Sequence, residues 1–142
     1  MHKQTGIKRI FMASLGAAAI ALSGCASIGP ETRVVLTGAN EIPAVNTGAT
    51  GFANFRVNPD KTVSGTMTTS GLDGRAAHIH VGLPGTNGPI AITLAQTSDG
   101  NWSVPAGSKF THGQYDAYLG GETYVNVHSP AFPNGEIRGQ LR

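Results

Sequence analysis

The sequence predicts an all-β domain, a Greek-key or immunoglobulin-like β-sandwich close to a barrel, with one short helix. Two observations carry this prediction. Beyond residue 32 the chain is rich in Gly, Thr, Val and Ala and poor in charged residues, and turn-forming residues recur at short intervals. The expected strands are residues 33–37, 51–57, 62–70, 76–81, 90–95, 123–128 and 136–141.

The connections between these strands contain residues that favour turns and one helix. Residues 58–61 (NPDK) predict a tight turn, residues 84–89 (PGTNGP) a longer loop, and residues 130–135 the last connection. Thr111 and Gln114 have the spacing of a capping box, Tyr115 and Tyr118 follow at helical spacing, and a glycine at 120 can end the turn. We therefore expect one short helix before the strand at 123–128.

The N-terminal segment predicts a lipoprotein signal peptide over residues 1–24. Basic residues precede an apolar stretch over residues 10–22, which is too short to span a bilayer comfortably. The stretch ends in Leu-Ser-Gly-Cys, which resembles a bacterial lipobox, and Cys25 is the single cysteine of the chain. An ordinary signal peptide with an incidental cysteine is the alternative. With Cys25 lipidated, residues 25–32 form a short tether and residues 33–142 the domain.

Removal of the signal changes the charge and the chemistry of the chain. Three basic residues leave with it, so the formal charge falls from +2 to −1 and no basic cluster is left for nucleic acid. The processed chain has no free thiol, and a small exported domain without disulfides depends on its core or on a metal. We expect a protein tethered by lipid to the bacterial cell envelope and facing the periplasm. Ala26 after the cysteine favours the outer membrane.

Two histidines stand on one side of an expected strand. In the stretch AAHIHVG, residues two apart point to the same face, so His78 and His80 project together while Ile79 points to the core. Their Cα atoms are separated by about 7 Å in a strand, a spacing at which two imidazoles can converge on one metal ion. A pair of surface histidines can also arise by chance.

A second strand repeats this pattern. In the stretch TYVNVH, inward valines place Asn126 and His128 on the outer side, so three imidazoles meet if the two strands are close. Nitrogen ligands without thiolates favour Cu(II) or Zn(II). Asp73 and Glu136 are the carboxylates nearest in sequence, and we expect them to hold the histidine tautomers.

Several motifs in order along the chain resemble the CHRD domain, named after chordin. They are NEIPAV at 40–45, GATG at 48–51, AAHIH at 76–80, GPI at 88–90, YVNVH at 124–128 and GEIRGQL at 135–141. The resemblance implies a β-sandwich domain that occurs in chordin and in many exported bacterial proteins. It implies little about activity.

The histidine pattern is also similar to the copper site of Cu,Zn superoxide dismutases. That resemblance implies that His78, His80 and His128 bind copper, that one further histidine completes the site, and that an arginine attracts the anion. His112 and Arg138 are the candidates for these two roles, and Arg138 is expected to face outward beside His128. The zinc-binding cluster and the disulfide of that family have no counterpart here, so the resemblance implies a copper-only form.

Three functions follow from these observations. The first is a copper-dependent superoxide dismutase, with superoxide as its substrate. The second is a copper-binding module for storage, delivery or resistance. The third is a protein-interaction domain in which the histidines are incidental, which rests on fold analogy alone. The sequence is compatible with a homodimer and does not decide the oligomeric state.

Overall fold

The computed structural model describes residues 27–141 of the chain. It contains nine strands, one 3₁₀ turn (η1, Gly38–Asn40) and one α-helix (α1, His112–Leu119). The strands are β1 (Glu31–Thr37), β2 (Thr50–Val57), β3 (Val63–Ser70), β4 (Ala76–Val81), β5 (Ile90–Thr93), β6 (Ala95–Ser98), β7 (Asn101–Ser103), β8 (Thr123–His128) and β9 (Ile137–Leu141).

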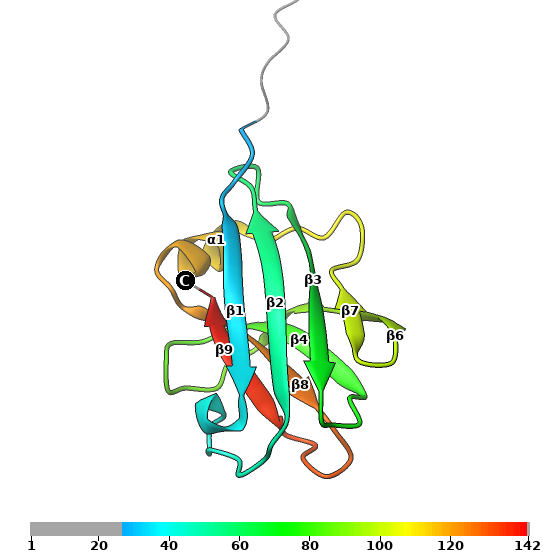
Figure 1. Cartoon of the computed structure of the whole chain (residues 1–142). Coiled ribbons are helices and arrows are strands. Elements are labelled where there is room, and N and C mark those ends of the chain that lie inside the picture. Colours follow the sequence, from blue (N-terminus) through cyan, green and yellow to red (C-terminus); the bar gives the residue numbers. More distant parts are fainter. Residues whose placement is uncertain (1–26, 142) are drawn as a thin grey trace, which may run out of the picture.

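All nine strands belong to one antiparallel sheet, which curls into a nearly closed barrel. Its order is β5-β4-β8-β9-β1-β2-β3-β7-β6, so the two edge strands are β5 and β6. These two strands are consecutive in the chain and are separated by Leu94 alone. The edges therefore meet, and Figure 1 shows β1, β2 and β3 in one layer with β4 and β8 crossing behind them. This arrangement confirms the predicted all-β sandwich with a barrel-like form.

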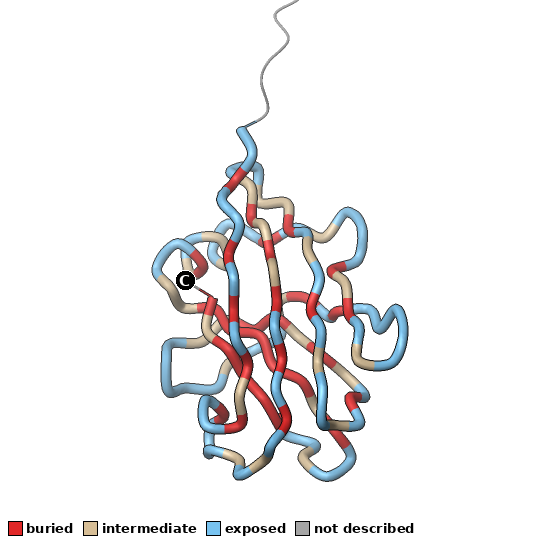
Figure 2. The backbone as a smooth tube through the Cα atoms, viewed as in Figure 1, coloured by how far each residue is buried: buried red, intermediate tan, exposed pale blue. Residues whose placement is uncertain are grey.

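The interior of the barrel holds the apolar residues that alternate along the strands. Buried side chains from all the strands except β6, together with residues of the connections, form one cluster, and the largest include Phe55, Met67, Ile79 and Phe110. Along β1 exposed and buried residues alternate. Along β8, by contrast, five of six residues are buried, so this strand is covered on both faces (Figure 2).

The predicted helix is present with the predicted cap. The Thr111 side chain accepts from the Gln114 N–H, and the Gln114 side chain accepts from the Thr111 N–H. The Tyr118 hydroxyl lies 2.9 Å from Thr32 Oγ1 and so ties the helix to β1. β1 begins at Glu31, two residues before the predicted domain boundary.

The structure contains two strands that the sequence did not predict. All four residues of β6 are exposed, and β7 has three residues, so neither shows an apolar–polar alternation long enough to be recognised. Trp102 of β7 points into the barrel, opposite Met67 of β3. The predicted strand at 90–95 is divided at Leu94, where the chain passes from one edge of the sheet to the other.

The predicted signal peptide and Cys25 lie outside the described residues. Within residues 27–141, no helix has the length and hydrophobicity needed to cross a membrane.

Candidate metal centre

Neighbouring strands bring three of the predicted histidines together. β4 pairs with β8 so that His78 is opposite Asn126, His80 opposite Tyr124, and Ala76 opposite His128. Residues that pair across an antiparallel sheet share a face. One ring nitrogen from each of His78, His80 and His128 lies within 4.8 Å of the other two. The predicted three-histidine cluster is therefore present, on the outer face of the barrel.

Backbone carbonyls fix the tautomers of two of these rings. His80 Nδ1 lies 2.8 Å from the Gly88 carbonyl oxygen, and His128 Nδ1 lies 2.9 Å from that of Pro133. A carbonyl only accepts, so each Nδ1 carries its proton and each Nε2 of a neutral ring is left with a free lone pair. His80 Nε2 is buried and has no hydrogen-bond partner, and His128 Nε2 lies 3.1 Å from His78 Nδ1.

The surroundings of the cluster favour neutral imidazoles, the form that binds a metal. Burial lowers the pKa of His78 to about 4, helped by repulsion from His128 and then His80. Burial also lowers the pKa of His80, and its bond to the Gly88 carbonyl acts in the opposite direction. Both rings are thus available as ligands near neutral pH.

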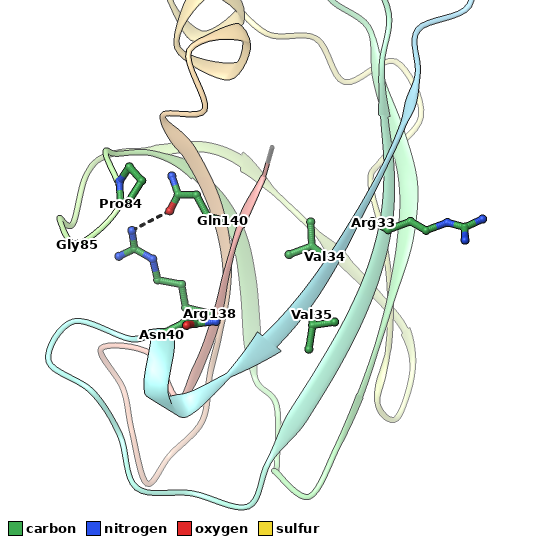
Figure 3. Close-up of a pocket in the computed structure, with 8 residues that line it drawn as sticks. All are labelled: Arg33, Val34, Val35, Asn40, Pro84, Gly85, Arg138 and Gln140. Carbon is green, nitrogen blue, oxygen red and sulfur yellow. Dashed lines mark hydrogen bonds between the residues drawn. The ribbon is translucent and has the colours of Figure 1, made fainter.

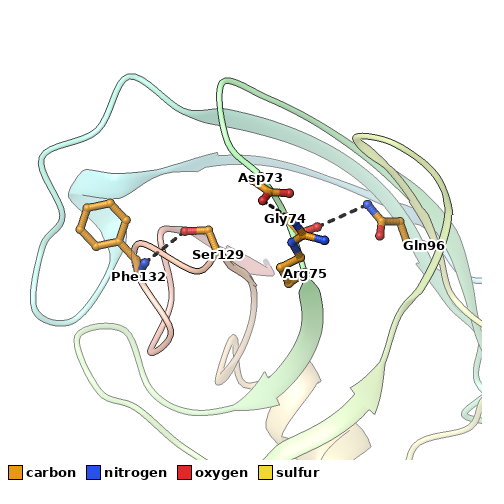
Figure 4. A network of polar contacts seen from close by, with 6 residues as sticks. All are labelled: Asp73, Gly74, Arg75, Gln96, Ser129 and Phe132. Atoms are coloured by element: carbon orange, nitrogen blue, oxygen red, sulfur yellow. Dashed lines mark hydrogen bonds and ion pairs between the residues drawn. The ribbon is translucent and has the colours of Figure 1, made fainter.

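The carboxylates that we expected to hold the histidines do not contact them. Asp73 pairs with Arg75 at 2.6 Å on the surface (Figure 4). Glu136 is buried and accepts from Thr47 Oγ1 at 2.8 Å. The loops that follow β4 and β8 supply carbonyls in their place. Gly88 is needed for this because a Cβ at this position would collide with the Val81 carbonyl.

His112 is separate from the cluster, in contrast to the expected fourth ligand. It begins α1, its side chain is 84% exposed, and Nε2 lies 3.6 Å from Asp116 Oδ2 in the next turn. This helix has a single buried residue, Tyr118, and its first turn lies on the surface. The fourth position of the site needs another candidate.

Arg138 lies on the predicted face of the sheet but is buried, with 2% of its surface exposed. Its guanidinium donates to Asn87 Oδ1, the Leu83 carbonyl and Gln140 Oε1 at 3.2–3.4 Å. Its Cζ lies 3.5 Å from the centre of the Tyr124 ring. Arg138 therefore faces outward from the sheet as predicted, but the loop over residues 82–89 covers it, so it is not open to an approaching anion.

Tyr124 connects Arg138 to the three clustered histidines. The His80 ring stacks on it with centroids 4.7 Å apart and planes 2° apart. β8 lies between β4 and β9, so the tyrosine ring stands between His80 and Arg138. The Gly88 N–H donates to the tyrosine hydroxyl at 3.1 Å. Arg138 therefore supports the position of His80 through Tyr124, and we assign it a positioning role.

Two cavities open beside this region. One of about 350 Å³ lies between β1 and the 82–89 loop, with Arg138 and Gln140 in its wall while Arg33 points away from it (Figure 3). The other, of about 190 Å³, lies between residues 41–45 and 131–135, and its lining is mostly apolar. Glu41 and Gly135 belong to its wall, close to the His128 loop.

Sequence reasoning missed Glu41, and it read Asn126 only as an outward neighbour of His128. Both are 3% exposed. Asn126 Oδ1 lies 3.1 Å from His128 Nε2, and the Asn126 amide also stabilises the Glu41 carboxylate. One feature of the sequence could have identified Glu41. It is the only charged residue between positions 34 and 55, and it lies in the apolar motif NEIPAV.

A known domain covers almost the whole described fold. Residues 32–141 match the model of the CHRD domain, so the chain belongs to the CHRD family. Searches among curated proteins and among solved structures found no match. The family assignment confirms the first resemblance and leaves the metal and the activity to be argued from the site.

Proposed function

We propose that this CHRD protein is a copper-binding protein that holds the ion with His78 Nδ1, His80 Nε2 and His128 Nε2. The observation that carries the proposal is the buried, unpartnered Nε2 of His80, in a cluster where one ring nitrogen from each of the three histidines lies within 4.8 Å of the other two. A buried acceptor without a donor costs folding free energy, which a cation can offset.

The ligand chemistry supports copper ahead of zinc. The described residues contain no cysteine, so the site offers nitrogen and oxygen donors alone. Such donors bind Cu(II) more tightly than Zn(II) at a given geometry. Zinc is the alternative, and metal analysis distinguishes the two.

Superoxide dismutation is the activity that we propose to test first. Bound copper would supply one-electron redox chemistry. The chain would hold the ion with neutral imidazoles, and His78 and His128 remain partly exposed, so a small anion can approach from their side. The burial of Arg138 specifically favours the second candidate, a module that binds copper for storage, delivery or resistance without turnover.

We also propose that the protein is lipid-anchored at Cys25 and that its site faces the periplasm, which rests on the lipobox-like segment of the sequence. Gly29 donates to Asn58 Oδ1 at the 58–61 turn, so the tether would leave the barrel at that end. The loops at 41–45 and 131–135 lie at the opposite end (Figure 1). A Cys25→Ser variant should leave the membrane fraction, and density separation of the wild-type membranes tests the expected outer-membrane location.

Copper binding is tested on the processed chain in detergent, with a competing chelator. We expect about one copper per chain, and a loss of affinity of at least 100-fold in His78→Ala, because a ligand is removed. His112→Ala is the matched control and should bind as the wild type does. A wild type that retains no stoichiometric copper, or a His78→Ala variant that binds normally, would contradict the proposal and favour the metal-free interaction domain.

The copper-loaded protein then decides between catalysis and binding alone. Its rate of superoxide consumption is compared with that of copper held by free histidine at the same concentration. A clearly higher rate supports the dismutase. An equal or lower rate leaves storage, delivery or resistance as the function.

A further inference from the structure

We propose that Asn126 supplies the fourth ligand through Oδ1 and that Glu41 orients its amide for this role. This inference rests on the proposed metal site and assigns two residues that neither the sequence motifs nor the histidine cluster identify. Asn126 lies in the middle of β8, directly opposite His78, and its side chain is on the same face as the three histidines. The first step is the contact between Asn126 and His128.

That contact brings two acceptors together. His128 Nδ1 is committed as a donor to the Pro133 carbonyl, so Nε2 of the neutral ring carries a lone pair. Asn126 Oδ1 lies 3.1 Å from this Nε2, and an amide oxygen is also an acceptor. Two lone pairs at this distance repel each other unless a proton or a cation lies between them. With His80 Nε2 unpartnered nearby, a cation satisfies three acceptors at once.

The second step is the orientation of the amide, which Glu41 determines. Glu41 is 3% exposed, and its Oε1 atom is buried without a conventional hydrogen-bond partner. Glu41 Oε1 and Asn126 Nδ2 both lie next to the position that a Cβ of residue 135 would occupy, so only a glycine fits between them. An ionised carboxylate only accepts, so the amide turns Nδ2 toward Glu41 and Oδ1 toward the histidines.

The surroundings of Glu41 show that the carboxylate is held where it can act on Asn126. Burial raises its pKa, and the Asn126 amide is the first influence that acts against burial, followed by the Ile42 N–H and the charge of Arg138. Gly135 has a φ of +126°, a backbone conformation that favours glycine. Glu41 of the NEIPAV motif and Gly135 therefore both contribute to the packing around the Asn126 amide.

A site of three ring nitrogens and one amide oxygen matches the donors that Cu(II) accepts in tetragonal geometry. Partners that orient a ligand typically change metal affinity by about 10–100-fold when they are removed. We expect a loss in this range for Glu41→Ala, which removes such a partner. Asn126→Leu keeps the size of the side chain but removes the proposed ligand, so affinity should fall at least about 10-fold, and Asn126→Asp, which restores the oxygen, should recover it.

The test uses copper(II) sulfate with the processed wild-type chain and its variants, and combines competition with electron paramagnetic resonance. Asn126→Leu should bind copper at least about 10-fold more weakly and shift the parallel g and hyperfine values. Glu41→Ala should weaken binding in the same direction. The matched control is Glu136→Gln, another buried carboxylate, which is bonded to Thr47 and should change neither quantity.

A second measurement uses the wild type alone, so it tests the inference even if the variants fold poorly. Addition of zinc should move the Asn126 side-chain amide signals in ¹H–¹⁵N spectra more than those of Asn87, whose amide donates to the Ile42 carbonyl. Unmoved Asn126 signals, or Asn126→Leu with wild-type affinity and spectrum, would overturn the inference while the three-histidine site stands. A wild type that binds no copper would overturn the proposed function itself.

Discussion

Strands β1–β3 and strands β8–β9 belong to the same sheet, yet they are buried in different ways. In β1 and β2 buried residues alternate with exposed or half-buried ones, so these strands face solvent on their outer side. In β8 and β9 nearly every residue is buried, including the polar residues Asn126 and Arg138. The inner faces of both regions are apolar, so the difference lies entirely in what covers the outer face.

Loops cover the outer face of β4, β8 and β9, and they contact it through polar groups. The Gly88 and Pro133 carbonyls accept from His80 and His128, and the Leu83 carbonyl accepts from Arg138. Burying polar groups costs free energy unless each is paired. A covered polar layer adds little to folding compared with an apolar one, so we interpret this layer as the part of the fold that serves the site.

The largest difference in stability should appear between two arginines. Arg138→Ala removes the partner of Tyr124, Asn87 and Gln140 inside the covered layer, and we expect the free energy of unfolding to fall by about 3–5 kcal/mol. Arg33→Ala acts on the exposed face of β1, where the ion pair of Arg33 with Glu31 is 3.5 Å long. This substitution should change the free energy of unfolding by less than about 0.5 kcal/mol.

Urea unfolding of the metal-free variants measures both values. Similar losses in the free energy of unfolding for the two variants would mean that the covered layer over β9 contributes no more to stability than the open surface of β1 does.

Alanine substitutions at two glycines distinguish the effect of backbone strain from the effect of crowding at the site. Gly107 and Gly135 both have positive φ, but a Cβ at Gly107 has open space whereas one at Gly135 meets Glu41 and Asn126. We expect Gly107→Ala to lower the free energy of unfolding by about 1 kcal/mol, and Gly135→Ala by about 2–3 kcal/mol. Copper affinity should fall in Gly135→Ala alone.

Thermal unfolding and copper competition on the same samples provide the comparison. An equal loss at both glycines, with normal copper binding, would argue against close packing around Glu41.

The metal-free protein should lose stability as the pH falls, and His78 should account for part of the loss. Its pKa is about 4 in the folded chain and ordinarily 6.5, so between these values the unfolded chain binds more protons. The free energy of unfolding therefore decreases from about pH 6.5 down to about pH 4. His80 acts in the same direction and Glu41 in the opposite one, so the comparison is made between wild type and His78→Asn.

His78→Asn should have a shallower dependence on pH than the wild type in this window, whereas His112→Asn on the exposed helix should match the wild type. Parallel curves for wild type and His78→Asn would show that the His78 ring is as easily protonated in the folded chain as in the unfolded one.

The contrast between the two regions also explains what could be predicted from the sequence. Composition and the spacing of turn residues predicted seven strands, and alternation predicted the inward side of β4 and β8, because Ile79, Val125 and Val127 follow period two. The same rule correctly placed Arg138 on the outer face of β9, but it did not predict that the arginine is buried there. Alternation reports which residues share a face and says nothing about a loop that returns over that face. The partners of His80 and His128 are backbone carbonyls, which no side-chain motif encodes.

Glu41 and β6 could not be predicted for two different reasons. β6 is exposed throughout and has no apolar side to recognise. Glu41 is separated from Asn126 by 85 positions in the chain, and a contact of that range depends on the sheet order β8-β9-β1, which brings the end of β1 beside β9. The histidine cluster could be predicted because β4 and β8 each show an alternation of inward apolar residues and outward histidines within a short stretch of sequence.

The smallest effect should come from the open half of the barrel, even for an aromatic residue. Phe52 is 44% exposed on the outer side of β2, opposite Val35 and Thr68 on the neighbouring strands. Phe52→Thr keeps a good strand former and loses one cross-strand contact, which is worth about 0.2–1 kcal/mol. Copper affinity should stay at the wild-type value because no residue of the site contacts this face. A loss above about 2 kcal/mol in urea unfolding would show that something also covers β1–β3, and the contrast with β8–β9 would then be one of degree.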